Sequence, residues 1–273
     1  MPDVTVPRIV GLHDVAQHHA VADLFRRIWL AESVEAVLNP HVIRALAHAG
    51  NYVVGAYAGQ RLVGGAVAFF GTDHLHSHIA GVDPAWQRAG VGYAIKQHQR
   101  AWALERGITR ICWTFDPLVR RNARFNLHRL GALATEYLPD FYGAMTDGLN
   151  AGQPSDRLWV TWALTSPRAA AAARGEVPEV DTGALRAAGA AVLLDRAGQR
   201  PVEPVEAGDL PADGRPVLVA VPEEVEALRA EDPPAATAWR YALRDALGAA
   251  LGAGYRITGM SRDGFYLLEV PEP

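Results

Sequence analysis

A short glycine-containing turn carries the clearest chemical signal in this sequence. It reads Gln87-Arg88-Ala89-Gly90-Val91-Gly92, and a helical pattern of apolar residues begins directly after it. Such a turn directs several backbone N–H groups towards one point at the positive end of a helix, where a diphosphate binds well. Because glycine has no side chain, the ligand can approach the backbone closely; a bulky side chain at Gly90 or Gly92 would block it.

The turn also has a simpler interpretation and a competing ligand. An isolated pair of glycines at a tight turn most often binds nothing. A dinucleotide fingerprint needs three glycines and a parallel strand–helix–strand start, whereas here two glycines follow a hairpin pattern. We therefore set the dinucleotide fingerprint aside and keep a phosphate-binding turn as the hypothesis.

Three histidines precede the turn on one expected strand. His74, His76 and His78 alternate, so their side chains share one face of the strand. They can line a substrate pocket with one ring acting as a base near neutral pH, they can be hydrogen-bonded structural residues, or they can bind a metal ion. We favour the three in that order, because no cysteine or carboxylate nearby completes a metal site; Asp73 is a possible partner of one ring.

Composition restricts the class of protein. The chain has 273 residues, 49% hydrophobic and 21% charged, with a net charge of −4 and no block of Lys or Arg, which argues against a nucleic-acid partner. The single cysteine, Cys112, lies in an apolar run and is expected to be an inert core thiol. We see neither a signal peptide nor a membrane span, so the expected location is the cytoplasm.

The first part of the chain has the patterns of mixed α/β structure. The hydrophobic periods predict a helix at 15–28 capped by Asp14, a helix at 40–48, a hairpin of strands 52–57 and 62–70, and a strand at 75–82. After the glycine turn they predict a helix that ends at Gly107, a strand at 108–115, a helix at 122–130 capped by Asn122, and a strand at 158–164.

The remainder of the chain predicts a second, smaller unit. Residues 166–181 change in composition and are expected to be a linker. Strand patterns follow at 191–194 and 217–221, a helix at 235–251, and strands at 255–258 and 265–270. We therefore expect a catalytic domain at 1–165, a linker at 166–181 and a C-terminal α+β subdomain at 182–273.

The glycine turn and its surroundings resemble the GNAT superfamily of acyltransferases over about residues 7–164. The family pattern is Gln/Arg-x-x-Gly-x-Gly/Ala, and this chain has Gln87-x-x-Gly90-x-Gly92 between a strand and an amphipathic helix. The stretch from Trp113 to Leu118 is similar to a narrower bacterial branch of predicted acetyltransferases. The resemblance implies a mixed α/β sheet with splayed central strands and acyl-CoA as co-substrate.

The resemblance also implies which residues bind acyl-CoA. In this family the turn holds the CoA diphosphate, and pantetheine fills the gap where the preceding strand splays from the next. The implied contacts are the strand residues Ile79, Ala80, Gly81 and Val82, the turn residues Gln87, Arg88, Ala89, Gly90, Val91, Gly92 and Tyr93, and Asn122 on the later helix.

For the chemistry, the family implies a base on the strand before the turn. That position falls at or next to His78, so we expect His78 and His76 to be catalytic. The family's tyrosine that protonates the departing thiolate corresponds to Leu127, which is a departure from the pattern. Its neighbour Asn126 is a further catalytic candidate, and Tyr137 or Tyr142 could supply the acid from the next segment. Glu32 and Trp113 are the candidates for substrate binding.

The resulting prediction is a GNAT-type N-acyltransferase that acts directly on the amine of a small molecule or amino acid. Acetyl-CoA is the expected donor, and direct transfer needs no metal. Two alternatives remain: a succinyl-CoA-dependent amino-acid N-succinyltransferase, since some relatives are associated with N-succinylamino acids, and a non-catalytic acyl-CoA-binding sensor. We expect no nucleic-acid or membrane partner, and a homodimer is possible.

Overall fold

The computed structural model describes residues 7–145, 152–202 and 210–271. The chain divides into two compact units, one formed by residues 1–113 and 145–152 and the other by residues 114–144 and 153–273. Within the described ranges, no helix combines the length and apolarity needed to cross a membrane.

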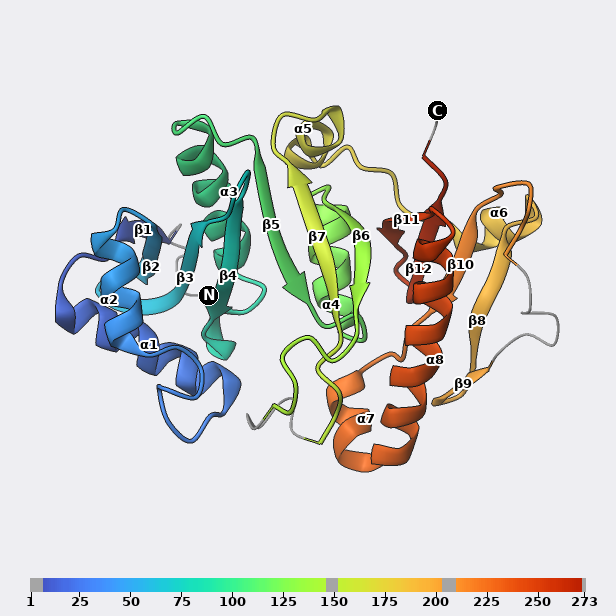
Figure 1. Cartoon of the computed structure of the whole chain (residues 1–273), viewed down its shortest axis with the longest axis horizontal. Helices are drawn as coiled ribbons and strands as arrows, with labels where there is room; N and C mark the ends of the chain where they lie inside the picture. The colour runs from blue at the N-terminus through green and yellow to red at the C-terminus, as the bar shows by residue number, and fades with distance from the viewer. Residues whose placement is uncertain (1–6, 146–151, 203–209, 272–273) are drawn as a thin grey trace. The chain divides into compact units, whose positions relative to one another are not determined.

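The first unit is a sheet with helices on both faces (Figure 1). Its strands follow the order β1–β2–β3–β4 in antiparallel pairs, and β5 joins β4 in parallel. The elements are β1 (Arg8–Gly11), α1 (Val15–Trp29), α2 (Pro40–His48), β2 (Tyr52–Ala58), β3 (Arg61–Phe70), β4 (Leu75–Val82), η1 (Pro84–Trp86), α3 (Val91–Leu104) and β5 (Arg110–Phe115).

Two neighbouring glycines of β3 show which helix covers which face. A Cβ atom at Gly65 would meet Val21 and Phe25 of α1, whereas one at Gly64 would meet Val91 and Ile95 of α3. Because successive residues of a strand point to opposite faces, α1 packs on one face of the sheet and α3 on the other. Glycine allows both helices to approach the strand closely.

Strand β4 carries a bulge at its histidines. Ile79 and His76 are three residues apart on β4, but their partners Val67 and Phe69 are two apart on β3, so β4 has one extra residue at this point. A bulge re-aims side chains, and bulges are common beside active sites. The sequence pattern predicted the strand's bounds but not the bulge.

The ladder between β4 and β5 is short. It consists of the pairs Leu75–Ile111 and His76–Cys112, and β4 then continues for six residues to Val82. The two strands are therefore joined at one end only, which agrees with the splayed central strands that the sequence predicts.

The second unit is a sheet with a long helix against it. Its strand order is β7–β6–β11–β12–β10–β8–β9, and α8 packs against β6, β9, β10 and β8. The elements are α4 (Arg120–Ala123), η2 (Arg124–Arg129), β6 (Leu133–Leu138), β7 (Arg157–Ala163), α5 (Pro167–Arg174), α6 (Thr182–Ala187), β8 (Ala191–Ala197), β9 (Arg200–Val202), β10 (Val217–Ala220), α7 (Val225–Glu231), α8 (Pro233–Gly252), β11 (Arg256–Met260) and β12 (Phe265–Glu269).

Most predicted elements are confirmed, with two corrections. The expected linker at 166–181 contains α5, because Ser166 accepts a hydrogen bond from the Ala169 amide, Pro167 follows as the first helical residue and an alanine run extends the helix. Asn122 does not cap the later helix: the N-cap of α4 is Val119, and η2 continues α4 as a π-helix. The predicted division into 1–165 and 182–273 differs from the two units and stays a prediction.

Candidate active site

The glycine turn forms an exposed loop that opens the N-terminus of α3. Asp83 fixes its start, since its carboxylate accepts a hydrogen bond from the Ala85 amide at 3.0 Å. Arg88 and Gly90 both have left-handed backbone angles, with φ of 69° and 80°. Gly90 is the N-cap residue of α3 and supplies no side-chain acceptor to the first turn of the helix. No side chain at the N-cap therefore competes for the amides of Val91 and Gly92, and the start of a helix attracts an anionic ligand.

His74, directly before β4, and His76 and His78 of β4 form a row of rings, as their alternation predicts. The ring centroids of His74 and His76 are 6.1 Å apart, and those of His76 and His78 are 6.2 Å apart. Phe69 of β3 lies beside His76 at 4.9 Å and His78 at 5.8 Å. Phe69 follows Val67 by two residues, and Val67 packs in the core beneath α1, so these rings lie on the α1 face of the sheet.

The environment of the row keeps two rings neutral near pH 7. Burial, followed by the neighbouring His78, His74 and Lys96, lowers the pKa of His76 to about 4. Burial also lowers the pKa of His78. A neutral imidazole can accept a proton, so both rings have the protonation state that a general base requires.

Sequence reasoning overlooked Lys96, which is buried on the opposite face of β4. Its ammonium donates to Ser77 Oγ at 2.8 Å and to Gln99 Oε1 at 3.2 Å, and it lies 4.0 Å from the centre of the Trp113 ring. Burial lowers the pKa of Lys96 to about 7. The available signal was its spacing: Lys96 follows Val91, Gly92 and Ile95 on the stripe that faces the sheet, where lysine is rare.

Comparison with known families assigns the domain. The sequence profile described as "Acetyltransferase (GNAT) family" matches residues 16–132. The chain contains a GNAT acetyltransferase domain. The match confirms the predicted family for this part of the chain and supports a transferase activity. Among curated proteins, no match to the sequence was found.

Several solved structures of acetyltransferases are similar to part of this chain at low sequence identity. They include the ribosomal-protein-S18-alanine N-acetyltransferase of Escherichia coli (13% identity, 59% of this chain, 95% of that chain, TM-score 0.48). A putative acetyltransferase of Salmonella typhimurium with acetyl-CoA has 16% identity; the match covers 59% of this chain and 96% of that chain, with a TM-score of 0.48. An N-acetyltransferase of Staphylococcus aureus has 10% identity; the match covers 59% of this chain and 100% of that chain, with a TM-score of 0.49. With values this low, the assignment rests on the family match.

The residues predicted to bind acyl-CoA fall into both units. Ile79, Ala80, Gly81 and Val82 lie on β4, and the turn residues through Tyr93 lead into α3, so these form one continuous edge of the first unit. Asn122 is an exposed residue of α4 in the second unit. Its role at the CoA site stays a prediction.

The other predicted site residues have varied surroundings. Trp113 is buried and its ring faces Lys96, whereas Glu32 is exposed just after α1. Asn126 is 4% exposed within η2. Tyr137 donates to Asp156 Oδ2 at 2.7 Å, and burial together with that carboxylate raises its pKa far above the ordinary value, which makes it a poor acid. Tyr142 lies 3.3 Å from Thr114 Oγ1.

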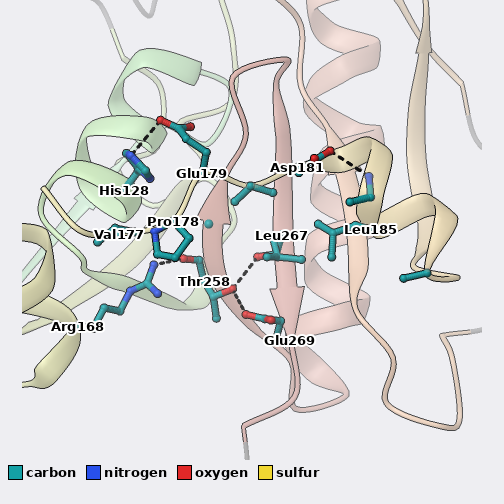
Figure 2. A pocket seen from close by; sticks show the side chains of 14 residues that line it. His128, Arg168, Val177, Pro178, Glu179, Asp181, Leu185, Thr258, Leu267 and Glu269 are labelled. Carbon is teal, nitrogen blue, oxygen red and sulfur yellow. Dashed lines mark hydrogen bonds and ion pairs between the residues drawn. The ribbon is translucent and has the colours of Figure 1, made fainter.

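The second unit contains a cavity that is separate from the predicted site residues. Figure 2 shows this cavity of about 490 Å³, with Arg168, Pro178, Glu179 and Leu267 among its lining residues. His128 and Glu179 form an ion pair across 3.3 Å at its edge. None of the described residues that line it belongs to the predicted site. Likewise, the described part of the chain contains no group of three His, Cys, Asp or Glu residues placed to hold a metal ion.

The pKa of His76 predicts acid sensitivity of the GNAT domain. Because the folded pKa is about 4 against an ordinary 6.5, the unfolded state binds a proton between these values that the folded state does not. Stability is therefore fully present above pH 6.5 and falls as the pH drops towards 4. Between pH 7 and 5 this ring should account for about 1–2 kcal/mol of the loss of unfolding free energy.

Urea unfolding at pH 7 and pH 5 checks this expectation. His76→Phe keeps an aromatic ring beside Phe69 but cannot titrate, so its unfolding free energy should depend less on pH than that of the natural chain. The exposed variant His48→Phe serves as the control and should keep the natural dependence. Equal pH dependence in His76→Phe and the natural chain would contradict the proposed environment of His76.

Proposed function

We propose that this protein is an acetyl-CoA-dependent N-acyltransferase for the amine of a small molecule or an amino acid. The observation that carries the proposal is the position of the neutral rings of His76 and His78. They lie at the bulge of β4, where the β4–β5 ladder ends: His76 belongs to its last pair, and His78 follows two residues later. In the GNAT family the opening between these two strands, beyond the end of their ladder, binds the pantetheine arm and the thioester.

The glycine turn and the opening between β4 and β5 bind different parts of acetyl-CoA. The amides around Gly90 and Val91 bind the CoA diphosphate, since the first turn of a helix attracts anions. The edge of β4 from Ile79 to Val82 provides backbone donors and acceptors for pantetheine. The acceptor amine then approaches from the α1 face, where the histidine row lies and where Glu32 follows α1.

The transfer is a direct attack on the thioester. The amine nitrogen forms a bond to the carbonyl carbon, and His78 takes the proton that the nitrogen loses, directly or through a water molecule. His76 is the second candidate for this role. The C–S bond then breaks and its electron pair leaves with the CoA sulfur.

A free-thiol release assay tests the proposal. Acetyl-CoA and succinyl-CoA are each offered with a panel of small amines and both enantiomers of the amino acids. We expect amine-dependent CoA release with acetyl-CoA, and a loss of about a hundredfold in kcat for His78→Ala. His48→Ala, at the exposed end of α2, is the matched control and should keep full activity. Equal activity of the two variants would remove His78 from the mechanism.

A non-catalytic acyl-CoA sensor is the second candidate function. It is favoured by Leu127, which is fully buried at the position where the family pattern has its tyrosine acid. Calorimetric binding of acetyl-CoA without release of CoA to any amine would support the sensor. Preferential use of succinyl-CoA would instead establish the succinyltransferase alternative.

A further inference from the structure

Lys96 is a buried cation surrounded by neutral groups. Its side chain is 5% exposed, and its partners are the Ser77 hydroxyl, the Gln99 side-chain carbonyl and the Trp113 ring. Among the described residues, no Asp or Glu forms an ion pair with it. A buried ammonium without a carboxylate is costly to folding, and this cost lowers the pKa of Lys96 to about 7.

A hydrogen-bond donor without a partner lies beside the ammonium. The Gln99 side chain is fully buried, and because its Oε1 accepts from Lys96, its amide nitrogen Nε2 is left without a hydrogen-bond partner within the described chain. Two hydrogen-bond donors, one of them charged, thus meet in one buried place. Of these donors, the Gln99 amide has no acceptor within the described chain.

The location of Lys96 connects it to the opening between β4 and β5. The last ladder pair is His76–Cys112, and the next residues of the two strands are Ser77 and Trp113, which are the groups that Lys96 contacts. The ammonium therefore lies where the strands begin to separate. It approaches from α3, the helix whose N-terminus carries the glycine turn.

The histidines and Lys96 lie on different sides of β4. Ser77 points towards α3, whereas His76 and His78 lie beside Phe69 on the α1 face. A thioester in the opening would have neutral bases on one face and a cation on the other. This is the arrangement that amide formation needs, because a proton leaves the nitrogen while negative charge develops on the sulfur.

We propose that Lys96 is the group that stabilises and protonates the departing CoA thiolate. The inference rests on the proposed function, since it requires a thioester in the opening. As the C–S bond breaks, the sulfur receives the electron pair and then a proton from the Lys96 ammonium. The neutral amine of Lys96 regains a proton from solvent, equal to the proton that the histidine releases, so the cycle balances. Lys96 thereby protonates the thiolate, the step that the family's tyrosine performs and that Leu127, at the corresponding position, cannot perform.

The ionisation of bound coenzyme A tests the charge directly and needs no turnover. The thiolate of CoA absorbs in the ultraviolet, so the pKa of the CoA thiol in the complex can be measured by titration. The same titration of the desulfo-CoA complex gives the absorbance change of the protein's own groups, which is subtracted. We expect the thiol of bound CoA to have a lower pKa than free CoA in the natural chain. The pKa should return towards the free value in Lys96→Met and stay low in Lys96→Arg.

Steady-state rates and a matched variant separate charge from structure. Lys96→Met should lower kcat with acetyl-CoA by about a hundredfold with little change in KM, and Lys96→Arg should recover part of the rate. Ser77→Ala removes the hydrogen bond but keeps the ammonium, so it should retain the low thiol pKa. The melting temperature of Lys96→Met should not fall, since methionine fills the same space without an unpaired charge.

The outcomes distinguish this proposal from the proposed function. A natural chain that turns over acetyl-CoA, with the same thiol pKa and kcat in Lys96→Met, would overturn the role of Lys96 and leave the acyltransferase intact. Equal losses in Ser77→Ala and Lys96→Met would show that Lys96 acts through packing, which also overturns it. A natural chain that binds no CoA would overturn both.

Discussion

Asp116→Asn is expected to lower the free energy of unfolding by about 3–5 kcal/mol, because it leaves a buried guanidinium without its carboxylate. Asp116 follows β5, and its two oxygens accept hydrogen bonds from Arg240 of α8, both at 2.8 Å. Arg229 of α7 adds a third at 2.6 Å. The side chains of Arg240 and Asp116 are 1% and 8% exposed, so water cannot replace the lost partner.

The charge state of Asp116 agrees with this expectation. Burial by itself raises the pKa of a carboxyl group, but the charges of Arg240 and Arg229 hold the pKa of Asp116 well below its usual range. The carboxylate is therefore ionised throughout the neutral range. An asparagine of the same shape would still accept the hydrogen bond that the Leu118 amide donates, so the variant tests the charge and not the size.

Chemical denaturation followed by circular dichroism measures the effect. Glu226→Gln is the matched control, since Glu226 forms an ion pair with Arg121 in the same unit but both side chains are partly exposed. That control should lose less than about 1 kcal/mol. Adding Arg240→Met to Asp116→Asn should recover part of the loss, because it removes the unpaired charge. Similar losses for Asp116→Asn and Glu226→Gln would contradict a buried ion pair.

Gly90→Ala is expected to weaken acetyl-CoA binding by about tenfold or more. Gly90 has a φ of 80°, which an alanine tolerates poorly, and the relaxed backbone would turn the first amides of α3 away from the diphosphate. Losing one charge-assisted hydrogen bond costs roughly 1.5–3 kcal/mol, and 1.4 kcal/mol corresponds to a factor of ten in affinity.

Gly107→Ala provides an unusually close control for this change. Gly107 follows the other end of α3, has a φ of 72°, and like Gly90 has open space where a Cβ would be placed. Both variants should lose about 1–2 kcal/mol of stability from backbone strain. Only Gly90→Ala should lose affinity in calorimetry with acetyl-CoA. Equal affinities in the two variants would remove the diphosphate from this turn.

Local sequence patterns determined most of the first unit. The helix at Pro40–His48 and the strand at Leu75–Val82 have the bounds that hydrophobic period and turn residues predict, and Asp14 caps α1 with a capping box. The glycine turn identified the family, because its spacing and its strand-to-helix context are contiguous in the chain. These features depend on residues within a few positions of each other, which is why a single sequence contains them.

Features that depend on distant residues were not predicted. The bulge of β4 exists because two residues of this strand, Ser77 and His78, lie opposite one residue of β3, Ala68, and a register of this kind is a property of the pair of strands. The partners of Arg240 and Arg244 are features of the same kind. In the structure Arg240 pairs with Asp116 and Arg244 with Asp156, and both partners lie far away in the chain.

The candidate site divides in the same way. The sequence by itself determined the phosphate-binding turn, the histidine row and the absence of the family's tyrosine at Leu127. Only the tertiary structure decided that Lys96 lies behind β4, at the residues where the β4–β5 ladder ends. The position of one lysine on the buried stripe of a helix does not show whether a carboxylate from a distant part of the chain pairs with it. That depends on which side chains three separate elements bring together, and here they are a serine, a glutamine and a tryptophan.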